Sequence, residues 1–160
     1  MLNLGRYSVQ NIQVARVYPS LVDRILEIVA LLLALFIWGS AIWIYFILHD
    51  KSGSSSVFAT AGGATAVALI LGISAYIPIR MIKFPFRITE HNAQAQLFLA
   101  RRLVRVLNVV TLLIFITIVF TQHEQACGIP TGMAHICTGV ATILLILIII
   151  VYYIFAYRYR

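Results

Sequence analysis

The sequence predicts an all-α integral membrane protein. The predicted fold is a four-transmembrane-helix bundle with both chain ends in the cytoplasm and the third helix extended into the cytoplasm. Two observations lead to this fold class. The chain of 160 residues is 62% hydrophobic and only 11% charged, whereas a soluble domain is about half apolar and about a quarter charged. Its apolar residues also form four long runs, and about 20 helical residues suffice to cross a hydrocarbon core of about 30 Å.

The four expected spans belong to a single membrane domain, residues 1–160. They cover residues 25–48, 57–79, 103–121 and 133–155. The first run is longer than the apolar core of about 7–15 residues in a secretory signal peptide, and no small-residue cleavage site follows it. We therefore expect the first run to remain in the protein as a transmembrane helix.

The distribution of Lys and Arg predicts the orientation, because cytoplasmic connections carry an excess of these residues. Of the 12 basic residues, only Lys51 falls on the far side of the predicted topology. The others fall in the amino-terminal tail, in and directly after the loop 80–102, and after the fourth span. This pattern favours attraction to anionic lipid headgroups, and we expect no nucleic acid partner. The residues expected to contact headgroups or a partner are Arg80, Lys83, Arg87, Arg101, Arg102 and Arg105.

A helix start is predicted just before the first span. Ser20 can cap the first backbone N–H groups, and Asp23 lies three residues later near the positive end of the helix dipole. Glu27 lies one turn inside the span. It could pair with Arg24 or extend to the membrane interface. Alternatively, Glu27 is a functional intramembrane carboxylate.

The cytoplasmic loop is expected to lead into one long helix. Pro85 keeps the preceding residue extended, Thr89 is a good N-cap, and Glu90 would lie in the first turn. Two faces are expected on this helix. The apolar face comprises Ala93, Leu97, Ala100, Val104 and Leu107, and the face expected toward headgroups or cytosol comprises Gln94, Arg101, Arg105 and Asn108.

The same loop resembles that of a known family. Its motif residues are Pro85, Thr89, Glu90 and Asn92, within Phe84-Pro85-Phe86-Arg87-Ile88-Thr89-Glu90-His91-Asn92-Ala93 and followed by Arg101 and Arg102. This segment is similar to the cytoplasmic loop of small bacterial four-span proteins of the domain-of-unknown-function 1648 family. The resemblance implies a multi-pass protein of the bacterial cytoplasmic (inner) membrane. Some members of that family are linked to immunity and signalling against secreted toxins.

A stripe of small residues marks the second span, at intervals of four: Ser56, Thr60, Ala64, Ala68 and Gly72. Small side chains let another helix approach closely in a membrane. We expect the partner to be the first span, through Gly39 and Ser40. The alternative partner is the same helix of a second copy.

Candidate reactive side chains gather on the predicted outer side: His49, Asp50, His123, Glu124, Cys127, His135 and Cys137. Cys127 and Cys137 would face an oxidising compartment, so we expect a disulfide between them. A metal site that includes His123 and His135 is the alternative, although the spacings match no established zinc pattern. We expect no cofactor.

Catalytic motifs are absent, and the span centres hold no Asp, Glu, Lys, Arg or His. We therefore expect a non-catalytic membrane protein, not an enzyme. It would be an accessory, scaffold or signalling subunit that acts through helix packing and its basic cytoplasmic helix, with lipid and another membrane protein or a second copy as partners. The alternatives are an oligomeric transporter or channel component and a redox or metal-handling protein that uses the outer His and Cys residues.

Overall fold

The computed structural model describes residues 19–47, 54–77 and 93–158. These residues form four helices: α2 (Leu21–Ile47), α3 (Ser54–Ser74), α4 (Ala93–Cys127) and α5 (Gly132–Arg158). Each helix contains a stretch long and apolar enough to cross a membrane. The predicted fold class, an all-α protein with four membrane-spanning helices, is therefore confirmed for the part of the chain that the structure describes.

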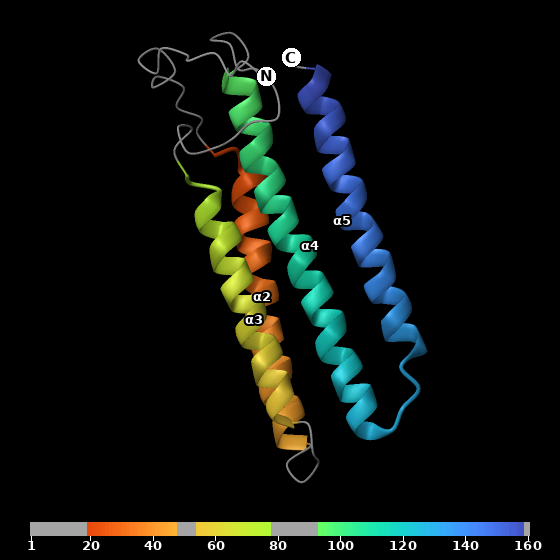
Figure 1. The fold of residues 1–160 in the computed structure, drawn as a ribbon. Coiled ribbons are helices and arrows are strands. Elements are labelled where there is room, and N and C mark those ends of the chain that lie inside the picture. Colours follow the sequence, from red (N-terminus) through yellow and green to blue (C-terminus); the bar gives the residue numbers. More distant parts are fainter. Residues whose placement is uncertain (1–18, 48–53, 78–92, 159–160) are drawn as a thin grey trace, which may run out of the picture.

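The helices run alternately in opposite directions (Figure 1). Helices α2 and α4 begin, and α3 and α5 end, at the same end of the bundle. We call this the basic end, because Arg102 and Arg105 in the early turns of α4 and Arg158 in the last turn of α5 lie near it. The opposite end holds the connection from α4 to α5.

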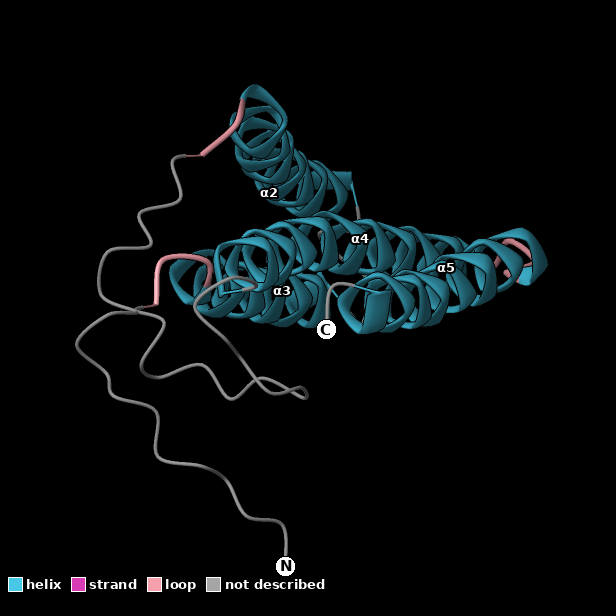
Figure 2. Ribbon diagram, turned by 90° about the horizontal axis from the view of Figure 1, so that it is seen from above, coloured by secondary structure: helices cyan, strands magenta, loops and turns pink. Residues whose placement is uncertain are grey.

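Helix α4 is the common neighbour of the other three. It packs against α2, α3 and α5, while α5 packs chiefly against α4. Seen from above, α2 and α5 lie on different sides of α4 (Figure 2). With 35 residues, α4 is about 50 Å long at about 1.5 Å per residue. It is therefore longer than the hydrocarbon core of about 30 Å.

Helix α4 continues beyond Thr121, where the sequence predicted the third span to end, and stops at Cys127. A glycine explains this stop. Gly128 has φ of 71°, a left-handed conformation that L-residues with a side chain rarely adopt. The Gly128 N–H donates to the Gln125 carbonyl at 3.1 Å, and the Ile129 N–H donates to the Glu124 carbonyl at 2.9 Å. This pair of bonds is the Schellman arrangement that ends many helices.

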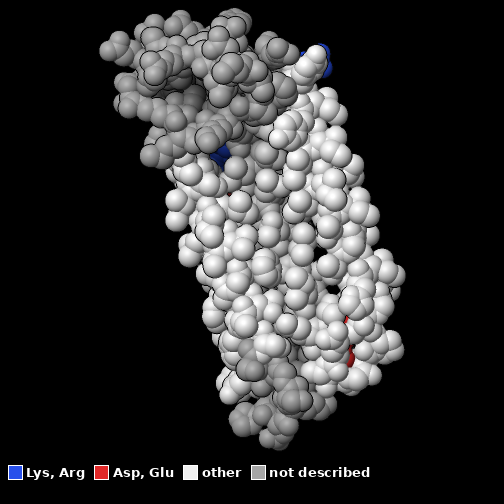
Figure 3. All heavy atoms as spheres, viewed as in Figure 1, with Lys and Arg blue, Asp and Glu red and all other residues white. Residues whose placement is uncertain are grey.

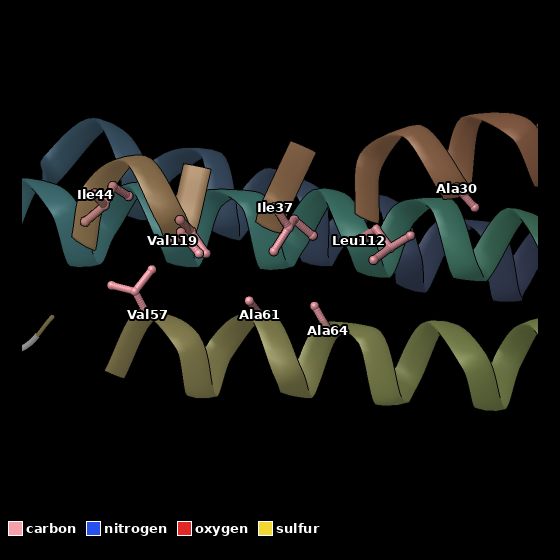
Figure 4. Close-up of a cluster of buried hydrophobic side chains, with 9 residues drawn as sticks. Ala30, Ile37, Ile44, Val57, Ala61, Ala64, Leu112 and Val119 are labelled. Carbon is pink, nitrogen blue, oxygen red and sulfur yellow. The ribbon is translucent and has the colours of Figure 1, made fainter. Parts of the chain in front are cut away.

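The buried core lies where α2, α3 and α4 meet. Its residues recur at spacings of three and four, which places them on one face of each helix. From α2 they are Ile37, Ala41 and Ile44; from α3, Val57, Ala61 and Ala64; from α4, Leu112 and Val119, all at most 1% exposed (Figure 4). Sequential helices α2 and α3 are therefore neighbours, as the small-residue stripe predicted.

The contact between α2 and α3 does not use the two α2 residues that the sequence predicts. A Cβ placed on Gly39 would meet open space, and the Ser40 hydroxyl donates to carbonyls of its own helix. The predicted contact through Gly39 and Ser40 is therefore wrong. Part of the stripe faces α4 instead, where Thr60 bonds the Gln122 side chain and the Ala68 carbonyl accepts from Asn108.

The outer surface of the bundle is apolar. Large side chains such as Leu35, Ile143 and Leu147 are 53–60% exposed, which suits contact with lipid chains. In Figure 3 the long middle of the visible face carries neither basic nor acidic atoms. Helix α5 is the most exposed of the four described helices, because only 6% of its most apolar 18-residue stretch is buried.

The start of α2 is fixed by the predicted cap. The Asp23 N–H donates to Ser20 Oγ at 3.3 Å, and the Ser20 N–H donates to Asp23 Oδ2 at 2.8 Å. This reciprocal pair resembles the capping box, in which two otherwise unpaired backbone donors are satisfied. The prediction that Ser20 caps the helix is confirmed.

Replacing Ser20 with alanine removes this cap, and we expect the free energy of unfolding to fall by about 1 kcal/mol. Unfolding of purified protein in micelles by increasing sodium dodecyl sulfate measures the change. Ser40→Ala is the matched control, since that hydroxyl bonds only carbonyls of its own helix, and it should stay within about 0.5 kcal/mol of wild type. Equal losses in both variants would contradict the assigned cap.

Candidate functional site

Two carboxylates occupy the first turns of α2 at the basic end. Asp23 is 2% exposed, and the Glu27 side chain is 37% exposed. They lie one helical turn apart and therefore on the same side of α2. Burying a carboxylate without a partner is costly. The groups around Asp23 and Glu27 therefore determine whether their charges are compensated.

Arg105 of α4 contacts both carboxylates. Its Nε donates to Glu27 Oε1 at 2.7 Å, and its Nη1 lies 3.6 Å from Asp23 Oδ1. The Arg105 side chain is only 6% exposed. A guanidinium holds several donors in a fixed plane, which suits a shared contact with two carboxylates. Arg105 therefore ties α4 to the first two turns of α2.

Tyr76 adds the end of α3 to this group. It follows the last turn of α3, and its hydroxyl donates to Glu27 Oε1 at 2.6 Å. This hydrogen bond favours the protonated phenol and, with partial burial, raises the pKa of Tyr76 above its ordinary value. The Arg105 guanidinium also lies 5.6 Å from the centre of the Tyr76 ring, within cation–π range.

Arg102 covers the group from the side of the basic end. Its Nε lies 3.7 Å from Asp23 Oδ1, and its Nη2 donates to Ser20 Oγ at 3.2 Å. Its guanidinium also lies 4.4 Å from the ring centre of Phe98. Asp23 Oδ1 accepts no hydrogen bond, so its attraction to the two arginines is chiefly electrostatic.

We call Ser20, Asp23, Glu27, Tyr76, Arg102 and Arg105 the charged cluster. Its two carboxylates are matched by two guanidiniums, so its formal charges cancel. Charges inside a membrane protein are commonly paired with one another in this way. Through the cluster, α2, α3 and α4 are held together at one level near the basic end. The arrangement is suited to fixing helices rather than to transferring protons or groups.

The structure corrects the expected direction of two residues of α4. Arg105 and Asn108 are 7% and 8% exposed and turn toward α2 and α3, not toward headgroups or cytosol. The physical reason is that buried partners are present: Glu27 for Arg105, and the Ala68 carbonyl, 3.3 Å from Asn108 Nδ2, for Asn108. Leu97, on the expected apolar face, is 1% exposed and packs inside the protein.

Several predicted site residues lie outside the residues that the structure describes: Arg80, Lys83, Pro85, Arg87, Thr89, Glu90 and Asn92, together with His49 and Asp50. Arg101 lies on α4 in an intermediate environment, next to the cluster residue Arg102. The headgroup contact of these basic residues stays a prediction.

At the opposite end, Cys127 and Cys137 both carry free thiols. The predicted disulfide is therefore not formed. Cys127 is the last residue of α4, and its Sγ lies 3.7 Å from Nε2 of His123, whereas Cys137 is exposed on α5. The His123 ring stacks on Trp43 with ring centres 5.6 Å apart.

His123 and His135 were the candidate metal ligands. Within residues 19–47, 54–77 and 93–158, no group of three or more His, Cys, Asp or Glu side chains is arranged to hold a metal ion. The described part of the end opposite the basic end therefore offers neither a bridge nor a ligand set, and the charged cluster remains the described site with the densest polar contacts.

Sequence reasoning missed the partners within the charged cluster. The sequence predicts that Glu27 pairs with Arg24 on the same helix or extends to the membrane interface, whereas the structure pairs it with Arg105 and Tyr76. A signal was present, because Glu27 and Arg105 have opposite charge and each lies about one turn inside the basic end of its predicted span. Two such groups at one depth in adjacent helices are expected to pair.

No family model, no curated protein and no solved structure matches this chain.

Proposed function

We propose that the protein is a non-catalytic multi-pass protein of the bacterial inner membrane. In this proposal it serves as an accessory, scaffold or signalling subunit that binds another membrane protein through helix packing. Its basic end would face the cytoplasm, where Arg101 and the basic residues of the loop before α4 would contact anionic headgroups. The bacterial origin rests on the resemblance of the cytoplasmic loop, which stays a prediction.

The observation that carries this proposal is how the polar groups in the middle of the bundle are used. Between the level of Arg105 and that of Gln122, the described helices hold no charged side chain. Several polar side chains there bond to each other or to the backbone. Trp38 Nε1 donates to Thr65 Oγ1 at 2.9 Å, and Thr138 Oγ1 donates to Thr117 Oγ1 at 2.9 Å. Proton relays and ion paths use charged or titratable groups at such positions, so this interior supports a packing role.

Helix α5 offers a lateral surface for a partner. It packs chiefly against α4, and most of its apolar side chains face outward. A Cβ placed on Gly139 would meet nothing within 4 Å. Small exposed residues allow another helix to approach closely within a membrane.

The experiment is affinity purification of the full chain from native membranes, solubilised in a mild detergent. We expect one partner at a fixed stoichiometry with wild type, and loss of that partner with Gly139→Leu. Gly39→Leu is the matched control, because Gly39 is also exposed in a membrane-spanning helix with open space around it, and it should retain the partner. A chain that purifies alone and conducts ions in proteoliposomes would overturn the proposal.

A further inference from the structure

A cavity of about 390 Å³ lies between α2 and α3, and residues of α4 form part of its inner wall. This volume falls within the range of about 300–1,000 Å³ that is typical of small-molecule sites. Small residues leave the space open: Ala30 and Ala34 on α2, and Ala68 and Gly72 on α3. Wall atoms beside an unfilled space lose their van der Waals contacts. A molecule that fills the cavity would restore these contacts.

A polar bridge between α2 and α3 bounds the cavity at each end. At the basic end, the Tyr76 hydroxyl donates to Glu27 Oε1 at 2.6 Å, and both residues line the cavity. Toward the opposite end, Trp38 Nε1 donates to Thr65 Oγ1 at 2.9 Å. Thr65 lines the cavity, and Trp38 lies one turn beyond Ala34, the last wall residue of α2. The opening of the cavity is therefore a window between two bridges.

This window opens on the outer surface of the bundle. Leu31 of α2 and Leu69 of α3 both line the cavity, and they are 60% and 59% exposed. Both helices are long and apolar enough to cross a membrane. The cavity is therefore continuous with the apolar surface that suits contact with lipid chains, and bilayer lipid is the molecule that meets its opening.

The cavity has the length and the depth of one lipid leaflet. Its wall residues run from Leu26 to Ala34 on α2 and from Thr65 to Tyr76 on α3, which corresponds to about 12–16 Å at about 1.5 Å per residue. One leaflet of a hydrocarbon core of about 30 Å is about 15 Å thick. Ala34 and Thr65 are also the middle residues of the spans in α2 and α3. The cavity therefore extends from the basic end to the middle of the membrane, as the acyl chains of one leaflet do.

The charges on the cavity wall are already paired. The charged lining residues are Glu27 and Arg105, and Arg105 Nε donates to Glu27 Oε1 at 2.7 Å. An ionised group inside the cavity would bring a charge without a counterion into a low-dielectric site, whereas a hydrocarbon chain would not. The wall therefore suits an acyl chain whose polar headgroup stays outside, at the basic end.

We propose that the cavity holds one acyl chain of a bilayer phospholipid from the leaflet at the basic end. The chain lies along α2 and α3, inside the layer of lipid that surrounds the bundle, and reaches α4. This inference goes beyond the proposed function and does not depend on it, because the partner surface proposed there lies on α5.

The first test asks whether an acyl chain lies inside the cavity. The full chain is reconstituted in phosphatidylglycerol vesicles that contain a trace of the same lipid with a diazirine in the middle of one acyl chain. After photolysis, adducts are located by mass spectrometry. We expect adducts on Ala68 of the cavity wall and on Ile143, which is 60% exposed on α5 and reports the surrounding lipid. Labelling of Ile143 without Ala68 would overturn the proposal.

Filling the cavity provides the comparison. Gly72→Leu places a side chain in the space, because its Cβ would meet only Asn108, at 4.0 Å. Since a leucine and an acyl chain cannot occupy the same space, the labelling of Ala68 relative to Ile143 should fall at least about threefold. Gly62→Leu on the same helix is the matched control, since its Cβ would meet nothing within 4 Å, and it should keep the wild-type ratio.

A second filled variant keeps this comparison decisive. Ala34→Leu fills the same space from α2 if Gly72→Leu does not fold, and it should lower the labelling of Ala68 in the same way. An unchanged ratio of Ala68 to Ile143 labelling in the filled variants would contradict a chain inside the cavity and would identify the labelling lipid as the surrounding layer.

The final test addresses the leaflet. Gly72 and Thr65 both line the cavity and lie about 10 Å apart along α3. A diazirine near the carboxyl end of the chain should label Gly72 at least about threefold more than Thr65, and one near the methyl end should show the opposite preference, because the methyl ends meet at the middle of the bilayer. The reverse order, or the same pattern with both probes, would overturn the assignment of the chain to the leaflet at the basic end.

Discussion

Replacing Arg105 with leucine is expected to lower the free energy of unfolding by about 2–4 kcal/mol. Arg105 is the side chain that both carboxylates of α2 share, at 2.7 Å for Glu27 and 3.6 Å for Asp23. Removing one partner of a buried ion pair typically costs about 3–5 kcal/mol, because the remaining charge stays buried without compensation. The expected loss is smaller here because the Glu27 side chain is 37% exposed, and solvent screens it in part.

Detergent unfolding of the purified variant, followed by circular dichroism and tryptophan fluorescence, measures this loss. Arg158→Leu is the matched control. Arg158 is exposed in the last turn of α5, away from the two carboxylates, and its removal should change stability by no more than about 0.5 kcal/mol. If Arg105→Leu were as stable as Arg158→Leu, Arg105 would not hold α2 and α4 together.

Replacing Leu112 with alanine is expected to lower the free energy of unfolding by about 1–3 kcal/mol. Leu112 is 1% exposed and belongs to the core shared by α2, α3 and α4. Leucine-to-alanine changes in soluble cores cost about 2–5 kcal/mol. The effect is smaller in a membrane, because the leucine would contact lipid rather than water once the helices separate. What remains is the loss of packing around the new cavity.

The adjacent residue supplies the control for this prediction. Leu113 is 39% exposed on the surface of the same helix, so Leu113→Ala removes the same atoms without leaving a cavity. We expect it to stay within about 0.5 kcal/mol of wild type. Equal losses at both positions would mean that α4 presents a different face to α2 and α3.

The sequence was sufficient to predict the number and type of the helices among the residues that the structure describes. Membrane-spanning helices are encoded by apolar length, which depends little on neighbouring segments. The start of α2 was also predictable, because Ser20 and Asp23 cap it within four residues. The end of α4 at Gly128 carries a comparably local signal, a glycine followed by a proline at residue 130.

The interior faces were less predictable. In a soluble helix the apolar side faces the core, but in a membrane both sides are apolar and this contrast disappears. The rotation of α4 therefore could not be read from hydrophobicity, and Arg105 and Asn108 were assigned to the wrong side. For the same reason the sequence wrongly predicts Gly39 as a contact on α2, whereas Ile37 and Ala41 are the buried residues there.

The charged cluster joins three segments that are far apart in the sequence. Glu27 and Tyr76 are 49 residues apart, and Glu27 and Arg105 are 78 apart. Opposite charge and a similar depth in the predicted spans limit the possible partners of Glu27 to a few residues, and Arg105 is one of them. Tyr76 carried no such signal, because tyrosines are also common at the ends of membrane spans as interface anchors. Only the packing of α3 against α2 brings its hydroxyl to the carboxylate.

A double-mutant cycle between Glu27→Gln and Arg105→Gln tests most directly whether the charged cluster holds α2 and α4 together at the basic end of the bundle. The free energy of unfolding is measured for wild type, both single variants and the double variant in the same micelles. We predict a coupling free energy of about 1–3 kcal/mol, so that the second substitution costs much less once the first is present. Losses that simply add to within about 0.5 kcal/mol would contradict a direct ion pair between α2 and α4.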